Sequence, residues 1–528
     1  MKISVKGLFI ISLIIALLSR TIIFLSSPFM VSTSDSGSWI SFAIEIHQAG
    51  MIAPHLNTIN YPGSEYIYPP VIPFILMLIY QITGSHGLSP FYIITILEIL
   101  VGGISVVPVF LMAKEKFGSN AALFSSIVYG LFSPFLYLIS FSGLPQEAGF
   151  LIILCIVYLM ERTLSNSYNS KSLFFSLFLL SFILNFIHDL SAFFFLAAVL
   201  FYFLYTIFSS VFGNTHNRMM VYVSFTSLLG SLSGFLVWYL PRIRWIVQGI
   251  SIYGSSANIS SASSILISDL KNLAQPVAIP TFMGYLSVIF PLLALFLLVL
   301  SIRSERGTIM SPLTFFLFMS FILTVISAPF PVIFVRLSYF LALFYSVSSG
   351  IVVAILFNES STQYYGRLSS FMRIVRKERK KVLKLIMVFI ILYSVWGIAF
   401  SYTAHTYYLS ENHSDFSAVK NVSQWILTNE GREKVIAASQ GTGYFIMGYT
   451  GNPVIDYVNQ GLLSQSTEIN ESIAAHMITA CPLANTLATF SLIEKYNVSL
   501  AVTYLNKSAV PGFYSLMYTY GNLRVYSV

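Results

Sequence analysis

Residues 8–39, LFIISLIIALLSRTIIFLSSPFMVSTSDSGSW, join an apolar run to a short polar segment. A helix needs about 20 mainly apolar residues to cross the hydrocarbon core of a bilayer, and the run from Leu8 to Leu25 comes close to that length. No small-residue cleavage site follows this run and Arg20 interrupts it, so we expect an uncleaved spanning helix rather than a signal peptide. Asp35 is the one ionisable residue of the polar segment, and a spanning helix places it at a membrane face.

The composition of the whole chain agrees with a membrane location. Of its 528 residues, 56% are hydrophobic and only 9% are charged, whereas a soluble domain carries about a quarter charged residues. Repeated apolar runs therefore predict a polytopic α-helical membrane protein. Lys and Arg (28) outnumber Asp and Glu (20), but the basic residues cluster beside the apolar runs, which argues against a nucleic-acid partner. Cys155 and Cys481 are the two cysteines, and they do not support a disulfide framework.

Basic residues set the predicted orientation. Lys2 and Lys6 precede the first run, and residues 367–384 hold eight basic residues and one acid, so the positive-inside rule puts both segments on the inner side. We expect eleven spans, with the N-terminus inside and the C-terminus outside. The spans fall at about 8–25, 90–112, 119–140, 148–160, two within 172–208, then 219–239, 277–300, 311–327, 332–356 and 382–402. The short apolar run 71–82 is left out, because counting it would put Lys114 outside; we expect an interfacial or re-entrant helix there.

This topology divides the chain into two predicted domains. Residues 1–404 form the transmembrane domain, with a long first outer loop at 26–89, and residues 405–528 form a small extracytoplasmic α/β domain. The apolar and β-branched patterns of the second domain predict its elements. Helices are expected at Asp415–Leu427 and Ala484–Tyr496, and strands at Lys434–Ser439, Leu500–Leu505 and Leu523–Val528. We expect the protein in the plasma membrane.

Charged and histidine side chains near the outer ends of the spans are the candidate site residues. A charge at the centre of a spanning helix costs on the order of 2.5–3.5 kcal/mol, so such residues usually face a cavity or a partner. The residues concerned are Asp35, Glu147, His188, Asp189, Arg242, Arg244 and Arg336. Because no nucleotide pool lies outside, a transferase acting there would need a donor delivered in the membrane, such as a polyprenyl phosphate.

The two loop carboxylates, Asp35 and Glu147, allow two chemistries. Together they could bind a divalent cation such as Mg²⁺ or Mn²⁺, or one could deprotonate an acceptor hydroxyl while the other orients it. Asp35 could also simply cap the helix that begins at Ser36, since Asp is a favoured N-cap residue.

Each of the remaining candidates could serve the site or have a purely structural role. A guanidinium matches phosphate geometry, so Arg336 is expected to bind the donor phosphate, unless it snorkels to lipid headgroups or pairs with Glu147 or Asp35. Arg242 and Arg244 either join that phosphate site or anchor the chain at the membrane interface. The His188–Asp189 pair is either part of the site or a polar hinge between two helices.

The order of these motifs resembles the C-type (GT-C) superfamily of membrane glycosyltransferases, which includes oligosaccharyltransferase catalytic subunits and protein O-mannosyltransferases. The resemblance rests on several motifs: Asp35 after the first span, Tyr68-Pro-Pro70 closing the outer loop, the inner turn Lys114–Gly118, Gln146-Glu147 in the second outer loop, the turn Asn185–Leu190, which is similar to a His-bearing turn of archaeal members, and Val335-Arg-Leu337. In place of the oligosaccharyltransferase motif Trp-Trp-Asp-Tyr-Gly, the chain has residues 439–444, SQGTGY.

This resemblance implies a dolichyl- or polyprenyl-linked sugar donor, a protein or lipid acceptor and an active site at the outer face. Asp35 and Glu147 would be catalytic, Arg336 would contact the donor phosphate, and Tyr68, Gln146, His188 and Asp189 are further site candidates. Two alternatives stay open. A transporter or flippase of a lipid-linked or anionic substrate could use the same charges, although we see no internal repeat. A catalytically inactive protein of the same fold would have much the same sequence.

Overall fold

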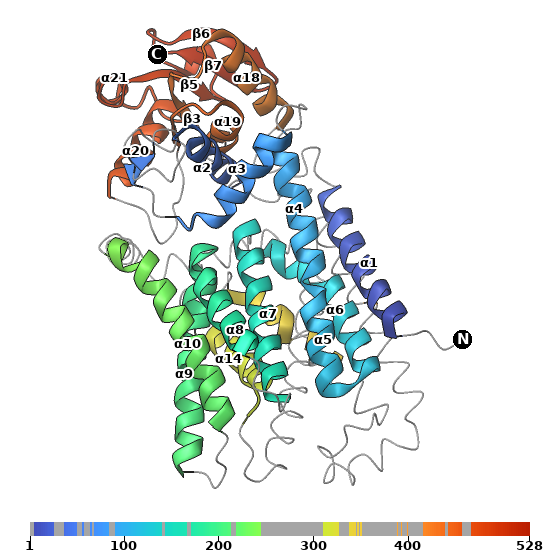
Figure 1. Ribbon diagram of the computed structural model, residues 1–528. Coiled ribbons are helices and arrows are strands. Elements are labelled where there is room, and N and C mark those ends of the chain that lie inside the picture. The colour runs from blue at the N-terminus through green and yellow to red at the C-terminus, as the bar shows by residue number, and fades with distance from the viewer. Residues whose placement is uncertain are drawn as a thin grey trace. The chain divides into compact units, whose positions relative to one another are not determined.

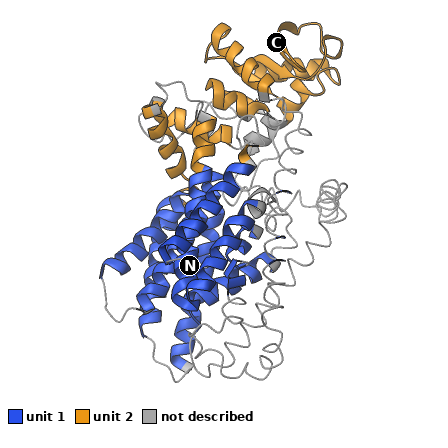
Figure 2. Cartoon of the chain, turned by 90° about the vertical axis from the view of Figure 1, so that its right-hand side faces the viewer, with its two compact units in different colours: residues 1–23, 98–238, 258–404 blue, residues 24–97, 239–257, 405–528 orange. Residues whose placement is uncertain are grey.

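The computed structural model describes residues 5–25, 36–49, 55–56, 64–65, 68–83, 90–139, 143–165, 171–212, 218–243, 310–326, 337–344, 346–347, 349–350, 388, 392, 399, 416–438, 442–456 and 466–528. The chain divides into two compact units (Figure 2). Unit 1 comprises residues 1–23, 98–238 and 258–404, and unit 2 comprises residues 24–97, 239–257 and 405–528. Unit 2 thus combines most of the predicted first outer loop with the C-terminal α/β region.

Unit 1 is helical. Its described helices are α1 (Val5–Phe24), the end of α4 (Pro90–Ile104), α5 (Val106–Phe117), α6 (Ser119–Ile139), α7 (Leu144–Ser165), α8 (Lys171–Ile183), α9 (Asp189–Phe212), α10 (Arg218–Trp238) and α14 (Pro312–Ile326), with short 3₁₀ turns η2 (Leu184–Phe186) and η4 (Ser338–Phe340) (Figure 1). Within the described ranges, five segments are long and apolar enough to cross a membrane. They are Val5–Ile22, Phe91–Phe117, Leu144–Leu164, Asp189–Val211 and Arg218–Trp238. The predicted polytopic helical architecture is therefore confirmed.

The number and sidedness of the spans stay predictions. The expected span at 277–300 lies outside the described residues, and of the expected span at 382–402 only residues 388, 392 and 399 are described. The expected break near residues 185–190 is present, because η2 separates α8 from α9. Residues 71–82 form the thirteen-residue helix α3 (Val71–Thr83), which is too short to span a bilayer upright.

Small residues bring α8 and α10 into close contact. Gly230 and Gly234 form a G-x-x-x-G pair, which lets helix backbones approach in membranes. A β-carbon at Gly234 would lie 2.5 Å from the carbonyl oxygen of Phe182 and 2.6 Å from Nδ2 of Asn185. That Asn185 Nδ2 donates to the carbonyl oxygens of Ser181 (3.1 Å) and Ser231 (3.2 Å). The amide thus links the turn at the end of α8 to α10.

Glu161 lies near the C-terminal end of α7 and connects α7 to α14 and α5. Its Oε1 accepts a 2.7 Å hydrogen bond from the backbone N–H of Leu313, in the first turn of α14. Its Oε2 lies 3.3 Å from Nζ of Lys116, near the end of α5. Unsatisfied amides at a helix N-terminus favour a carboxylate, so Glu161 fixes the start of α14.

The C-terminal part of unit 2 is a five-stranded mixed sheet with the order β4-β3-β5-β7-β6. Strands β4 (Val454–Asp456), β3 (Val435–Ala438) and β5 (Val498–Thr503) are parallel, and β7 (Leu523–Ser527) and β6 (Ser515–Tyr520) complete an antiparallel hairpin. The accompanying helices are α18 (Phe416–Asn429), α19 (Thr442–Thr450), α20 (Ser466–Thr479) and α21 (Thr486–Lys495). All five elements predicted here from the sequence are confirmed, each to within two residues at either end.

The β6–β7 turn and a buried tyrosine complete this sheet. Gly521 has φ 58° at the first central position of the β6–β7 turn, where Tyr520 pairs with Leu523, as a type II′ hairpin requires. The hydroxyl of Tyr514 donates a 2.8 Å hydrogen bond to the carbonyl oxygen of Ile478 at the end of α20, and burial raises the pKa of Tyr514. The core between sheet and helices includes Val435, Ala437, Ile455, Ala475 and Ile478.

Helix α2 (Ser36–Ala49) packs between α3 and α19 in unit 2 (Figure 1). Its buried face includes Trp39, Ile40, Ala43 and Ile46. A short antiparallel pair, β1 (His55–Leu56) and β2 (Ser64–Glu65), lies between α2 and α3 in the sequence. The helix that follows Asp35 is therefore covered by residues of the C-terminal α/β region.

The close α8–α10 contact predicts a specific stability effect. We expect Gly234→Val to lower the thermal midpoint of the purified protein, because the added carbons overlap the Phe182 carbonyl and the Asn185 amide; overpacking of this kind costs about 1–3 kcal/mol. Leu232→Ala is the matched control, since Leu232 lies on an exposed part of the same helix. Equal midpoints for the two variants would contradict the assigned packing.

Candidate functional site

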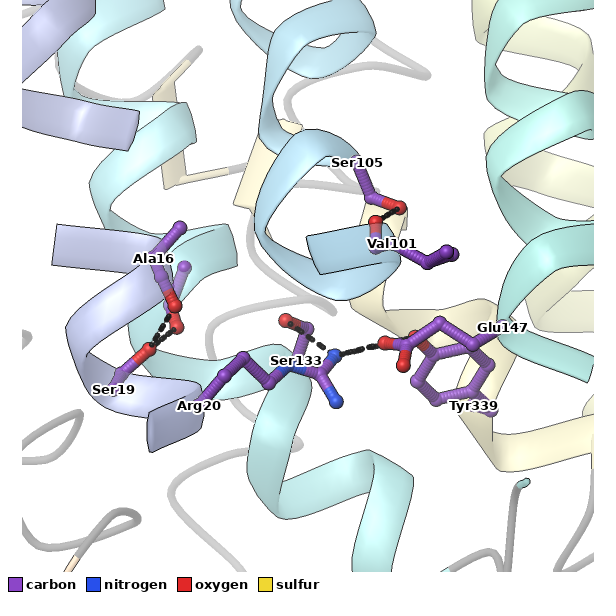
Figure 3. A network of polar contacts seen from close by, with 9 residues as sticks. Ala16, Ser19, Arg20, Val101, Ser105, Ser133, Glu147 and Tyr339 are labelled. Atoms are coloured by element: carbon purple, nitrogen blue, oxygen red, sulfur yellow. Dashed lines mark hydrogen bonds and ion pairs between the residues drawn. The ribbon is translucent and has the colours of Figure 1, made fainter. Parts of the chain in front are cut away.

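A buried ion pair links the first spanning helix to the start of α7. Arg20 lies in the last turns of α1 and Glu147 in the first turn of α7. Nη2 of Arg20 forms an ion pair with Oε1 of Glu147, and both side chains are almost fully buried, at 2% and 0% exposure (Figure 3). Glu147 is thus the predicted site residue that the structure places in a defined polar network.

Tyr339 and Ser133 complete this network. The hydroxyl of Tyr339, in η4, donates a 2.9 Å hydrogen bond to Oε1 of Glu147. Arg20 Nη2 donates to Oγ of Ser133 on α6 at 3.3 Å and to the Tyr339 oxygen at 3.4 Å. Figure 3 shows the guanidinium between Ser133 and the Glu147 carboxylate, with Tyr339 beside that carboxylate. We call Arg20, Ser133, Glu147 and Tyr339 the Arg20 network.

Close helix contacts hold the Arg20 network in place. A β-carbon at Gly102 of α4 would lie 2.7 Å from Glu147 Oε1 and 2.8 Å from Arg20 Cζ, so glycine leaves the room that the pair occupies. On the other side, Ser19 Oγ donates to the carbonyl oxygen of Gly130 at 2.5 Å. Ser19 directly precedes Arg20, and its hydrogen bond joins α1 to α6. It thereby fixes the backbone that carries the Arg20 side chain.

The pair is consistent with what charges require inside a membrane protein. Removing an ion from water costs several kcal/mol, and a buried charge persists when a partner and hydrogen bonds compensate it. Arg20 and Tyr339 supply that compensation at Oε1 of Glu147, and Ser133 Oγ accepts a hydrogen bond from Nη2 of Arg20. The second carboxylate oxygen, Oε2, has no hydrogen-bond partner within the described part of the chain. Glu147 is therefore held in a fixed orientation through Oε1.

His188 directly precedes α9, and its ring forms hydrogen bonds with Ser191 in the first turn of that helix. The backbone N–H of Ser191 donates to His188 Nδ1 at 3.3 Å, and Ser191 Oγ lies 2.9 Å from the same nitrogen. Nδ1 is therefore an acceptor, and a neutral ring carries its proton on Nε2. A β-carbon at Gly149 would lie 2.7 Å from Ser191 Oγ, so α7 and α9 are in close contact two residues after Glu147. Asp189 is the first residue of α9.

The remaining candidates divide between described and undescribed residues. Asp35, Arg244 and Arg336 lie outside the described residues, so their predicted convergence with Glu147 is untested. In unit 2, Tyr68 stacks on Phe42 of α2, with ring centroids 5.9 Å apart, and Arg242 is half-buried in the 3₁₀ turn η3 (Leu240–Arg242). Gln146 is buried beside Glu147 in the first turn of α7.

Three members of the Arg20 network were not predicted from the sequence: Arg20, Ser133 and Tyr339. Arg20 interrupts an apolar run, and that was its readable signal: a charge inside a spanning helix indicates a buried partner. Tyr339 carried no such signal, since it is one of 32 tyrosines in an aromatic-rich chain. Within the described ranges, no group of three or more His, Cys, Asp or Glu side chains is arranged to hold a metal ion.

Comparison with known proteins gives a consistent result. Residues 68–243 match the family described as dolichyl-phosphate-mannose-protein mannosyltransferase, and this range includes Glu147 and His188. No match was found among curated protein sequences.

Solved structures share the fold over nearly the whole chain. The apo oligosaccharyltransferase of Archaeoglobus fulgidus is 12% identical, with 95% of this chain and 69% of that chain covered at a TM-score of 0.60. Its complex with Zn and sulfate is 11% identical, with 98% and 73% covered at a TM-score of 0.58. ArnT from Cupriavidus metallidurans bound to undecaprenyl phosphate is 13% identical, with 97% of both chains covered at a TM-score of 0.53. The predicted resemblance is therefore confirmed: the chain has the fold of the C-type membrane glycosyltransferase superfamily.

Proposed function

We propose that the protein is a glycosyltransferase that moves a sugar from a polyprenyl or dolichyl phosphate or diphosphate to a protein or lipid acceptor at the outer face of the plasma membrane. The observation that carries this proposal is the burial of the Glu147 side chain together with its contacts to Arg20 and Tyr339. Its carboxylate is buried, paired with Arg20 and oriented by the Tyr339 hydroxyl. It lies within the residues that match a mannosyltransferase family, and one structure of the same fold is bound to undecaprenyl phosphate.

The proposed reaction divides the work among the candidate residues. The oxygen of an acceptor hydroxyl attacks the anomeric carbon of the donor sugar, and the bond from that carbon to the phosphate oxygen breaks. Asp35 takes the proton of the acceptor hydroxyl as general base. Arg336, aided by Arg242 and Arg244, compensates the charge of the departing phosphate. His188, Asp189, Gln146 and Tyr68 remain proposed contacts of the donor or acceptor.

Glu147 fits an orienting role better than that of a proton acceptor. Oε1 contacts both the guanidinium of Arg20 and the hydroxyl of Tyr339, so the carboxylate is held in one orientation. Groups held in place before the reaction lower its barrier, because little reorganisation is needed in the transition state.

A divalent cation shared by Asp35 and Glu147 was one expectation from the sequence. The donor set does not fit this at Glu147, because the guanidinium of Arg20 already neutralises that carboxylate and would repel a second cation. We therefore derive no step through a metal at Glu147. A cation held by Asp35 remains a prediction, which assays with and without EDTA, Mg²⁺ and Mn²⁺ test.

The roles of Asp35 and Arg336 predict a loss of transfer. With a labelled lipid-linked sugar and purified protein, we expect Asp35→Asn to lower kcat by about 100-fold or more, the usual range for a lost general base. Arg336→Gln should weaken donor use, seen as a lower kcat/KM. Arg432→Gln, an exposed residue beyond α18, is the control and should leave transfer unchanged. Full activity of a folded Asp35→Asn variant would remove the general-base assignment.

The Arg20 network predicts a coupled stability effect. Breaking a buried ion pair by removing one partner costs about 3–5 kcal/mol, because the other charge is left uncompensated. Arg20→Met and Glu147→Gln should each lower the thermal midpoint strongly, and the double variant should regain part of the loss. Transfer activity should stay low in the double variant, since the glutamine at position 147 carries no charge. Additive losses in the double variant would show that the pair contributes no coupling.

A further inference from the structure

Two glycines meet where α19 contacts the N-terminal turn of α2. A β-carbon at Gly448 would lie 3.0 Å from Cα and 3.2 Å from the carbonyl oxygen of Gly37, and 2.9 Å from Cζ of Phe91. Gly37 is the second residue of α2, which begins at Ser36 directly after Asp35. The backbone of the first turn of α2 therefore lies directly against α19, with no side chain between them.

Neighbouring contacts prevent this junction from adjusting easily. The Phe91 ring, from the start of α4, lies beside Phe445 and Tyr449 of α19, with centroids 5.5 Å and 4.7 Å away. Gly451, directly after α19, has a φ of 70°, which favours glycine. A β-carbon there would lie 3.8 Å from Cγ2 of Ile44 in α2. Backbone on one side and a packed ring on the other leave no flexible group that could move aside.

The end of α19 is itself tied to the sheet. Asn452 Nδ2 donates to the carbonyl oxygens of Gly431 (3.1 Å) and Lys434 (3.0 Å), in the segment that leads into β3. The backbone N–H of Asn452 donates to Oγ1 of Thr450 at 3.1 Å. Helix α19 is therefore a fixed part of the α/β region, and α2 is the partner that rests on it.

We propose that Gly448 is a positioning residue: through its contact with Gly37, the C-terminal α/β region sets the place of the first turn of α2, and with it the place of Asp35. This inference rests on the proposed function, in which Asp35 is the general base. Misplacing a reacting group by about 1 Å can cost about 100-fold in rate. The C-terminal region then acts on the reaction through α2, whatever else it binds.

Gly448→Ala and Gly512→Ala make a matched pair for testing this inference. A β-carbon at Gly512 meets no heavy atom within 4 Å, so the same substitution there adds no crowding. We expect Gly448→Ala to lower kcat by tenfold or more while KM for the lipid-linked sugar changes less than about twofold, and Gly512→Ala to match the unsubstituted protein. Thermal midpoints measured in parallel distinguish displacement from unfolding. Equal kcat values for the two variants overturn the proposal.

Two further variants separate the Gly37 contact from general packing. Adding Phe91→Leu to Gly448→Ala removes the ring contact and keeps the backbone contact, so activity should stay low; recovered activity would assign the effect to the aromatic cluster and overturn the proposal. Ile44→Ala loosens the α2–α19 contact without a clash and should lower kcat by about threefold. Unchanged kcat in Ile44→Ala would contradict the positioning role even if Gly448→Ala proved unfolded.

A labelling measurement tests the position of residue 35 without any transfer assay. Asp35→Cys is introduced into a Cys481→Ser background, because Cys481 is exposed, and the reaction rate with a membrane-impermeant maleimide is measured against that background. Gly448→Ala should change the rate at residue 35 by about threefold or more, and Gly512→Ala should not. If no variant or parent transfers sugar, the proposed function fails while a rate difference still supports the positioning. Equal rates overturn the positioning and leave the proposed function standing.

Discussion

Unit 1 depends on burying the charges of Arg20 and Glu147 together. Each ion alone would be unstable in a site with 2% or less exposure, and together they are stable only at contact distance. This requirement fixes α1 relative to α7. Because Ser133 and Tyr339 also bind the pair, it fixes α6 and the turn at 338–340 as well. Three separate parts of the sequence, α1, the consecutive helices α6 and α7, and the turn at 338–340, are thereby held by one electrostatic condition.

Small side chains are what allow that condition to be met. Between membrane helices there is little hydrophobic driving force, so close van der Waals contact and hydrogen bonds must supply the association. The contacts at Gly102 and Gly130 bring α4 and α6 up to the ion pair, and the contact of Gly149 with Ser191 brings α9 to α7. The same principle acts in unit 2, where Gly37 and Gly448 bring α2 to α19. Glycine contacts of this kind lie beside Arg20, Glu147 and His188.

Much of the fold could be predicted from local sequence pattern. Apolar runs predicted the spanning helices, and the polar residues at 185–190 predicted the break before α9. In the C-terminal region, β-branched residues predicted β3, β5 and β7. Strand β6 was missed because its residues are mostly exposed, so no alternation of apolar and polar residues marks it. Strand β4 has three residues, too few for a periodic signal.

The candidate site could be predicted only in part, because ion pairs depend on contacts between distant residues. Glu147 was found because a carboxylate beside an apolar run is unusual. Its partner could not be chosen from sequence, since Arg20 lies more than 100 residues away and Arg336 was an equally good cation. The structure shows Arg20 paired with Glu147, and Arg336 lies outside the described residues. The packing of α2 on α19 likewise joins residues far apart in the sequence, and no local pattern encodes it.

That packing affects how the protein is made. About 390 residues separate the end of α2 from the start of α19, and ribosomes add roughly 5–20 residues per second. Helix α2 therefore exists for about 20–80 seconds before its partner is synthesised. During that time the surface of α2 around Gly37 and Ile44 has no α19 to cover it. The newly inserted chain must shelter this helix at the bilayer surface or with a chaperone until its last quarter emerges.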